Sequence, residues 1–359
     1  MLTYTFHNNT TPFFRILKEK VDQYFVTQHL DKAGNVKVYR KSIILLVTAA
    51  SLYTLLVFFT LPIWVTLPLC MILGFTIAVI GFNVMHEGGH QSFSKHAWVN
   101  SLSAYSLNML GGNSYFWKIK HNINHHTYTN IEGMDSDIDV KPFMRLHEGQ
   151  PRHGYHRFQS LYWIILYGIS YIAWVFYEDF KKYFSSRVSG NSNKKGLPLR
   201  EHVIFWFSKI MYVLVYIVVP VIMVGWLSWL IGFLIITFFC GLTTSIVFQL
   251  AHVVEGTQFS SAQPADAHAQ DAKQEWAVHQ ILSTSNFATS SKLWHWLLGG
   301  LNFQIEHHLF PRISHIHYPA ISRFVKEACS ENHIVYAEYK SMRAAVLSHL
   351  KYLHKLGRT

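Results

Sequence analysis

Four apolar runs without a charged residue constrain this chain more than any other feature. Each is close to the roughly 20 residues that a helix needs to cross a bilayer core about 30 Å thick. Backbone polar groups surrounded by lipid must be satisfied internally, so runs of this kind form helices. The runs cover residues 42–61, 63–84, 210–227 and 228–250. The sequence therefore predicts an all-α integral membrane protein with four transmembrane helices in two hairpins, residues 42–84 and 204–250.

The positive charge lies mainly outside these runs. The formal net charge is +11, and cytoplasmic loops of membrane proteins collect Lys and Arg. We therefore expect residues 1–41, 85–203 and 251–359 in the cytoplasm, with both termini on that side. Basic flanks also attract anionic lipid head groups, whereas no recognition motif points to a nucleic-acid partner. We predict a single multi-pass domain over residues 1–359, with a polar surface loop at 266–273.

A fifth stretch, Leu161 to Tyr177, is apolar and uncharged but only about 17 residues long, at the lower limit for a span. If it crossed the bilayer, the histidines near the C-terminal end of the chain would lie on the opposite face from those before it. We therefore expect an interfacial or partly buried helix.

Three histidine clusters flank the apolar runs. Histidine is the commonest metal ligand in proteins, and side chains three or four residues apart share one face of a helix. The predicted topology puts all three clusters on the cytoplasmic side. The clusters are box one (His86 and His90), box two (His121, His125 and His126) and box three (Gln304, His307 and His308).

The residues alone leave the identity of the metal open. Seven clustered histidines exceed the needs of one metal and suggest two, and imidazole suits iron, copper, nickel and zinc alike. Cys70, Cys240 and Cys329 show no zinc-thiolate spacing. A metal transporter or sensor is an alternative, but it predicts ionisable residues within the spans, and the four runs contain none.

The boxes and their flanks resemble those of the membrane fatty acid desaturases over roughly residues 40–340. Box two is followed by Thr127-Tyr128-Thr129-Asn130, and box three lies between Gly299-Gly300-Leu301-Asn302-Phe303 and Leu309-Phe310-Pro311. A third box that begins with Gln resembles that of the front-end, acyl-lipid and linoleoyl-CoA desaturase-like group.

The resemblance implies a fold of two helical hairpins under a cytosolic helical cap that holds two irons. The seven box histidines are then the catalytic and metal-binding residues, and His252, just past the fourth run, is a further ligand. Gln304 departs from an all-histidine pattern, so an indirect role is expected for it. Glu255 is a candidate for orienting a metal-bound histidine. Asp135, Asp137 and Asp139 lack the Gly and terminal Glu of a calcium loop, which favours a supporting role.

The implied reaction is oxygen-dependent insertion of a cis double bond into the acyl chain of a lipid or an acyl-CoA. O2 is the co-substrate, and electrons come from an external ferredoxin or cytochrome b5-like protein. A related di-iron lipid or alkane hydroxylase, or a sphingolipid-modifying oxidase, shares the boxes and remains the alternative. We expect an acyl tunnel near Trp117, Trp294 and Trp296, and a docking face for the donor at Lys118, Lys120, Arg145 and Arg152.

Overall fold

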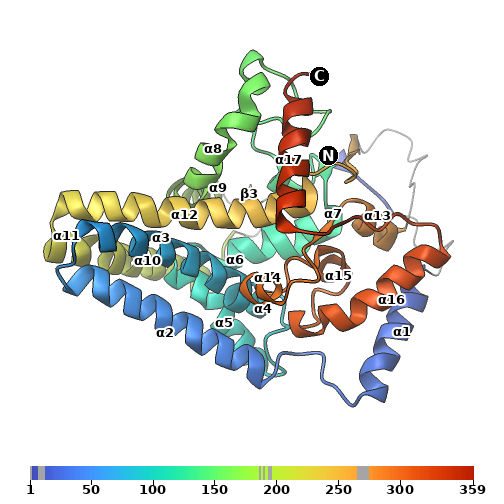
Figure 1. Ribbon diagram of the computed structural model, residues 1–359, viewed down its shortest axis with the longest axis horizontal. Coiled ribbons are helices and arrows are strands. Elements are labelled where there is room, and N and C mark those ends of the chain that lie inside the picture. The colour runs from blue at the N-terminus through green and yellow to red at the C-terminus, as the bar shows by residue number, and fades with distance from the viewer. Residues whose placement is uncertain (1, 7–12, 186, 189–190, 193–195, 265–274) are drawn as a thin grey trace. The chain divides into compact units, whose positions relative to one another are not determined.

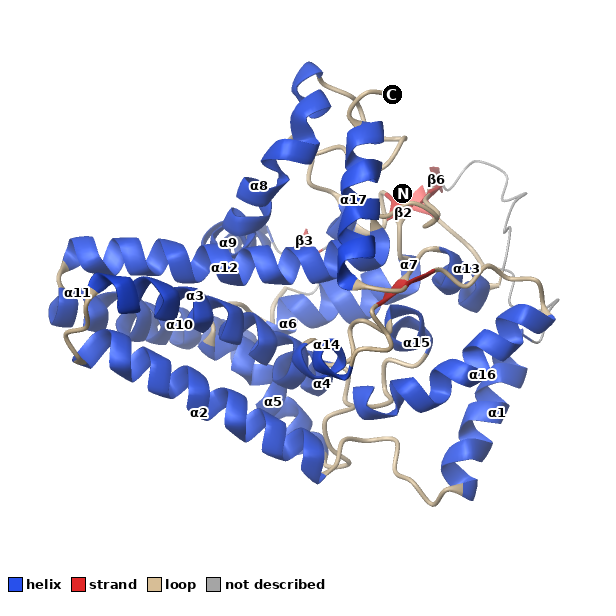
Figure 2. Ribbon diagram, viewed as in Figure 1, coloured by secondary structure: helices blue, strands red, loops and turns tan. Residues whose placement is uncertain are grey.

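The computed structural model describes residues 2–6, 13–185, 187–188, 191–192, 196–264 and 275–359, and most of its regular structure is helical (Figures 1 and 2). The loop predicted at 266–273 lies outside these ranges. Two compact units are each assembled from separate stretches of chain. The first unit comprises residues 1–34, 119–163 and 247–359, and the second comprises residues 35–118 and 164–246.

The second unit contains the long apolar helices. Helix α2 packs against α3 and α11, and α5 packs against α4 and α10; α2 and α3 lie side by side in Figure 1. Its helices are α2 (Val36–Phe58), α3 (Ile63–Ile80), α4 (His86–Gly89), α5 (Ala97–Met109), α6 (Ser114–Trp117), α9 (Asp179–Ser185), α10 (Leu199–Val213), α11 (Val219–Val224) and most of α8 (Gln159–Ala173) and α12 (Trp226–His252).

Local chemistry sets the ends of these helices. Asn35 caps α2, because its side-chain oxygen accepts a hydrogen bond of 2.9 Å from the backbone N–H of Lys37. Gly225 separates α11 from α12 with a φ of +81°, which glycine adopts without steric cost. Short π-helical segments, Gly81–Met85 and Leu214–Val218, join α3 to α4 and α10 to α11. Each of the four predicted apolar runs is therefore largely helical.

Among the described residues, five helices are long and apolar enough to cross a membrane, one more than the four predicted. They are Val36–Phe58, Ile63–Gly89, Gly154–Ser185, Leu199–Val224 and Trp226–His252. The additional helix combines a 3₁₀ segment (Gly154–Phe158), α8, a π-helical segment (Trp174–Glu178) and α9. At 32 residues it is far longer than the predicted run, because aromatic and polar residues continue the helix at both ends.

A buried ion pair ties together three parts of the second unit. The Lys209 ammonium of α10 lies 3.0 Å from the Asp179 carboxylate of α9, and it also donates to the carbonyls of Gly111, at 2.6 Å, and Val175, at 2.8 Å. Both side chains are almost completely buried. This pair could not be predicted, since Lys209 and Asp179 are thirty residues apart in the chain.

The first unit has a conventional apolar core. Leu17, Val21, Ile281, Ile305 and Ile321 are completely buried in it. Helix α1 packs against α13 and α16, α15 packs against the same two helices, and α1 and α16 lie side by side in Figure 1. The helices of this unit are α1 (Phe13–Thr27), α7 (His126–Tyr128), α13 (Trp276–Leu282), α14 (Lys292–Leu297), α15 (Gln304–Leu309), α16 (Tyr318–Glu331), α17 (Met342–Leu356) and 3₁₀ turns at Ser136–Ile138 and His315–His317.

The described strands are two-residue pairings that fasten loops. β1 (Leu2–Thr3) pairs antiparallel with β6 (Gln263–Pro264), and β3 (Arg187–Val188) pairs antiparallel with β4 (Asn191–Ser192). β2 (Ile131–Glu132) is parallel to β5 (Ser260–Ser261), and β7 (Asn286–Phe287) is parallel to β8 (Glu338–Tyr339). The β2–β5 pairing holds the chain after box two beside the chain that follows α12, and this positions the site described next.

Candidate metal centre

Box two lies on an irregular helix in which the predicted α-helical spacing does not hold. Lys118–His125 is π-helical and leads into α7, and π-helical turns are frequent at functional sites. His121, His125 and His126 are all buried. The Nε2 atoms of His121 and His126 lie 3.2 Å apart, so two imidazoles of this box face each other.

Box three packs its rings against those of box two. Gln304, His307 and His308 on α15 are buried, and the His126 ring lies 4.7 Å from the His307 ring and 4.4 Å from the His308 ring, measured between centroids. The preceding turn depends on Gly300, whose φ is +72° and whose Cβ, if present, would lie 2.5 Å from the Cβ of His315. Residues about 180 positions apart in the sequence therefore form one cluster.

His252, the last residue of α12, belongs to the same cluster. Its ring centroid lies 4.7 Å from that of His125 and 4.9 Å from that of His308. One ligand atom from each of His125, His252 and His308 can be chosen so that all three lie within 4.8 Å of one another, and the same holds for His121, His125 and Asp137. Three imidazoles, from the π-helical segment Lys118–His125, from α12 and from α15, thus point to one place.

The hydrogen bonds of this cluster suit a metal site. His125 Nδ1 donates to the Asp135 carboxylate at 2.9 Å, and His308 Nδ1 donates to Gln280 Oε1 at 2.8 Å. The Nε2 atoms of His125 and His308 are buried and have no hydrogen-bond partner among the described residues. Metal-binding histidines characteristically donate one ring N–H to a carboxylate or other acceptor and bind the metal through the other nitrogen. The residues therefore fit a bound transition metal.

Burial and neighbouring charges shift the pKa values of these imidazoles in different directions. Burial, with the neighbouring His126, holds the pKa of His308 well below its ordinary value, and burial lowers the pKa of His121 to about 4. For His125 burial also acts downward, but the carboxylates of Asp135 and Asp137 outweigh it and raise the pKa. Since a histidine ligand must be neutral to bind a metal, His121 and His308 are already in the binding form at neutral pH.

Two carboxylates after box two support it. Asp135 accepts from the backbone N–H groups of Asn130 and Asp137 as well as from His125. Asp137 lies 2.6 Å from the Lys120 ammonium, and although burial alone would raise its pKa, Lys120 and the nearby histidines hold it well below its ordinary value. Asp139, in contrast, is exposed and pairs with Lys141. Of the three aspartates for which a supporting role was predicted, Asp135 and Asp137 therefore contact box two, and Asp139 does not.

Replacing Asp135 with asparagine should weaken binding of a divalent transition metal by about 10- to 100-fold, which is typical when a residue supporting a metal-bound histidine is changed. Asparagine keeps the size of the side chain but removes the charge that fixes the His125 Nδ1 proton. Anaerobic titration of the purified chain with ferrous iron measures the effect, and Asp139→Asn in the same loop is the control. An unchanged affinity in Asp135→Asn would show that this carboxylate does not support a ligand.

Further residues hold the cluster, and they differ in whether the sequence indicates them. Thr129 Oγ1 donates to Gln280 Oε1 at 2.8 Å, and the Asn130 amide donates to the His252 carbonyl at 2.9 Å. His279, which the sequence placed outside any box, is buried and lies 2.7 Å from the Thr129 carbonyl. Thr129 and Asn130 follow box two directly, whereas Gln280 comes from α13 and could be found only from the fold.

Two predicted site residues differ in their surroundings. Gln304 is buried on α15, one turn before His307 and His308. Glu255 is exposed, and its backbone N–H donates to Ser348 Oγ at 3.1 Å. His252 Nδ1 instead faces the Ser283 carbonyl at 3.4 Å. The orienting contact expected from Glu255 is therefore given by Ser283, because the chain turns outward after α12.

Box one is in the second unit, at the end of the second apolar helix. The rings of His86 and His90 have centroids 4.6 Å apart, and the Trp117 ring lies 5.6 Å from each. Gly89 permits this packing, since a Cβ there would lie 2.2 Å from the Trp117 ring. Both histidines are buried. Trp117, expected near an acyl tunnel, thus packs directly on the two rings of box one.

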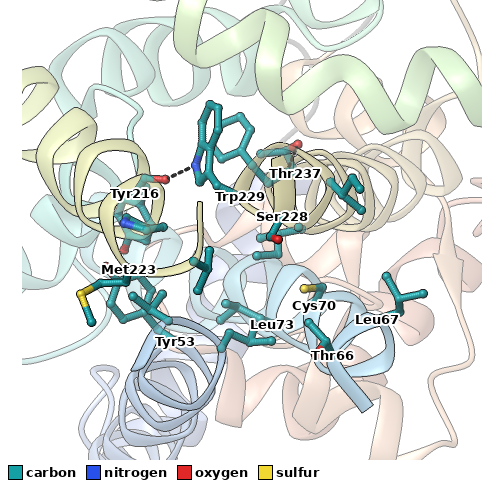
Figure 3. A pocket seen from close by; sticks show the side chains of 18 of the residues that line it. Tyr53, Thr66, Leu67, Cys70, Leu73, Tyr216, Met223, Ser228, Trp229 and Thr237 are labelled. Carbon is teal, nitrogen blue, oxygen red and sulfur yellow. Dashed lines mark hydrogen bonds between the residues drawn. The ribbon is translucent and has the colours of Figure 1, made fainter. Parts of the chain in front are cut away.

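The second unit also contains an apolar cavity of about 730 Å³ (Figure 3). Residues of α2, α3, α11 and α12 line it, among them Tyr53, Cys70 and Trp229, and the Trp229 indole donates to the Tyr216 carbonyl at 2.9 Å. Of the α3 residues that line the cavity, Ile77 lies closest to box one along the chain. At a helical rise of 1.5 Å per residue, Ile77 and His86 are about 13 Å apart along the helix. The cavity is therefore separate from box one, and none of the three tryptophans proposed for a tunnel lines it.

Comparison with known proteins decides the family. The family model of the fatty acid desaturases matches residues 62–340. The chain belongs to the fatty acid desaturase family. It is therefore an oxidoreductase that desaturates fatty acyl chains, and with its long apolar helices it is an integral membrane protein. This confirms the predicted activity and family.

Several desaturases are similar to this one over nearly its whole length. An sn-1 linoleoyl-lipid 6-desaturase of Arthrospira platensis is 33% identical over 348 residues, which is 96% of this chain and 92% of that protein. A protein of the same description from Synechocystis is 31% identical over 354 residues, 96% of each chain. An acyl-lipid (8-3)-desaturase of Physcomitrium patens is 31% identical and covers 97% of this chain and 72% of its own length.

Proposed function

We propose that this desaturase inserts a cis double bond at position 6 of a linoleoyl chain carried by a lipid, with a histidine-bound pair of irons. The observation that carries the proposal is the convergence of His125, His252 and His308, whose supporting hydrogen bonds all use Nδ1. Substrate and position are inferred from the two relatives described as linoleoyl-lipid 6-desaturases. The Gln-first third box supports the same group.

We assign the ligands as follows. His125, His252 and His308 hold one iron, and His121, His126 and His307 contribute to the other. His86 and His90 complete the set, as the three-box pattern of the family implies. Gln304, buried beside His307, acts indirectly, and Asp135, Gln280 and Ser283 fix the orientation of the ligand rings.

Bound iron supplies the oxygen chemistry that no amino-acid side chain can provide. In the overall reaction, O2 takes two hydrogens from adjacent methylenes together with two external electrons and two protons, and it leaves as two waters. The protein's own part is to hold the imidazoles in a buried cluster that excludes bulk water. It must also keep one pair of methylenes beside that cluster, since positioning alone can supply a large share of the barrier reduction.

Four crossings, with the histidines on the cytoplasmic side, are part of the proposal. His125 and His252 are in ring contact within one compact unit, so they lie on the same side of the bilayer. Three long helices separate them in the chain, Gly154–Ser185, Leu199–Val224 and Trp226–His252. An even number of these must therefore cross. We infer that Gly154–Ser185 does not cross, because its last turns carry Asp179, Lys181 and Lys182. The basic flanks support a cytoplasmic position for the histidines.

The proposal is tested by expression in a host that makes linoleoyl lipids but has no 6-desaturase. Mass spectrometry of derivatised fatty acids should find an octadecatrienoyl chain with a new double bond at position 6, in the lipid fraction rather than in acyl-CoA. His125→Ala, expressed to the same level, should give none. Hydroxylated chains without a new double bond would overturn the proposal in favour of a di-iron hydroxylase, and a double bond elsewhere would overturn the assigned position.

A further inference from the structure

The proposed reaction consumes two electrons, which a donor delivers to this chain. Its three cysteines are buried, and an iron–sulfur cluster needs four protein ligands. We propose that the exposed face of α17, together with Arg152 and Arg157, is the docking surface for an acidic electron-transfer protein. This inference rests on the proposed function, and all the residues that carry it belong to the first unit.

The charge on this face is predominantly positive. Helix α17 contains no acidic residue, and its exposed cations follow each other at helical spacing along one side. Glu148 is the carboxylate that contacts the face, 3.4 Å from Lys355, and both of these side chains are more than half exposed. We define the basic face by its exposed residues Arg152, Arg157, Arg343, Lys351, Lys355 and Arg358.

Backbone contacts assemble the basic face from two distant stretches. The Arg152 guanidinium donates to the Gly357 carbonyl at 3.1 Å, and the Arg358 guanidinium donates to the Arg157 carbonyl at 3.3 Å. These bonds fasten the C-terminal end of α17 to the chain just before α8. Four arginine and lysine side chains thereby gather at one end of the helix, and Lys351 and Arg343 continue the charge along it.

The opposite side of α17 packs on the chain that follows His252. The His349 ring lies 2.6 Å from the Val253 carbonyl, and Ser348 Oγ accepts from the backbone N–H of Glu255 at 3.1 Å. One helix, about 10 Å across, therefore separates the basic face from the residue next to the proposed ligand His252. A donor bound there would deliver electrons close to the iron pair.

Arg145 and Lys120, two of the cations expected from the sequence to form the docking face, contact other parts of the protein instead. Arg145 is 7% exposed, and its guanidinium donates to the carbonyls of Glu148, Gln150 and Leu356. Lys120 pairs with Asp137, and Lys118 is in the second unit. Of the cations predicted for docking in the first unit, Arg145 and Lys120 therefore make internal contacts that could not be seen in the sequence, whereas Arg152 is part of the proposed surface. Arg145 instead anchors the end of α17.

An anionic membrane surface would also attract a basic helix, but α17 lacks the matching apolar side. Helices that lie in the interface bury a hydrophobic face in lipid. The apolar side of α17, with Ala345, Leu353 and Leu356, is buried within the first unit, and Leu347 is the large hydrophobic residue that α17 exposes. The observations therefore favour a soluble acidic protein as the partner.

The test is a steady-state titration of the full-length chain with a reduced plant-type [2Fe–2S] ferredoxin in nanodiscs of neutral phosphatidylcholine. The variant Lys351→Glu/Lys355→Glu/Arg358→Glu should raise the KM for ferredoxin at least about tenfold, since reversed rim charges slow association. Arg343→Glu/Lys351→Glu, which leaves the helix end intact, should give a smaller rise. The wild-type KM should increase with salt, and that of the triple variant should respond less.

Controls separate this inference from the proposed function. Arg15→Glu/Lys292→Glu/Arg312→Glu changes three exposed cations elsewhere in the first unit by the same charge and should leave the KM within about twofold. Turnover driven by a small chemical reductant should be equal in all variants, and its absence in the wild type would refute the proposed function itself. Equal ferredoxin KM values in test and control variants would overturn the docking surface. The docking surface would also be overturned if the KM of the test variants rose only in nanodiscs that contain anionic lipid.

Discussion

Replacing His308 with alanine should reduce turnover by on the order of a thousandfold or more, the scale seen when a member of a unit that acts together is removed. The His308 ring is buried between His126 and His252, and Gln280 holds its Nδ1 so that Nε2 faces the cluster. Alanine would leave one iron a ligand short. Bound iron per chain should fall together with activity, while membrane insertion, judged by fractionation, should remain. His125→Ala should behave in the same way.

The matched control is His147→Ala, which removes another buried imidazole of the first unit. His147 stacks on Phe259 at 5.3 Å between centroids, and its removal should cost packing without changing iron content. Full turnover and full iron in His308→Ala would contradict its assignment as a ligand. Iron loss in His147→Ala equal to that in His308→Ala would mean that the assay reports general unfolding.

Replacing Lys209 with methionine should lower the free energy of unfolding by about 3–5 kcal/mol, as expected when one partner of a buried ion pair is removed. The ammonium satisfies the Gly111 and Val175 carbonyls as well as the Asp179 carboxylate. Methionine would leave the Asp179 charge buried with its main partner gone and would detach α9 from α10. The unfolding midpoint of the iron-free chain in detergent measures this loss.

Two controls make the Lys209 experiment specific. Lys18→Met removes the same charge from the pair with Asp22, whose side chains are 57% and 36% exposed, and such exposed pairs contribute only about 0–1 kcal/mol. Lys209→Met combined with Asp179→Asn should recover part of the loss, because the isolated carboxylate is gone. A Lys209→Met variant as stable as the wild type would show that the pair does not hold these helices together.

Much of the helical architecture could be predicted because it depends on local composition. Uncharged runs of about 20 residues leave a chain in lipid no alternative to helix, so the four runs and the Gly225 turn were predictable. The helix Gly154–Ser185 was underestimated, because its flanks are polar and aromatic and only tertiary packing decides that they continue the helix. The Lys209–Asp179 pair was missed for the same reason, since its two members come from different helices.

In the site, too, features set by nearby residues could be predicted, whereas contacts between distant parts of the chain could not. Spacing within each box and the predicted position of all boxes on one side of the membrane were sufficient to predict the clustering of His121, His125 and His126 with His307 and His308. The π-helical geometry of box two was not predictable from its amino-acid sequence. Gln280 could not be connected with His308 in advance, because that contact arises only when α13 packs against α15.

We propose above that these imidazoles hold two irons. Mössbauer spectroscopy with iron counting, on the purified full-length chain reconstituted anaerobically with ⁵⁷Fe(II), measures this directly. We expect two ferrous ions per chain in nitrogen-rich coordination, with the content reduced in His125→Ala and His308→Ala. A chain that binds no iron under these conditions, or that keeps the same iron in both variants, would contradict it.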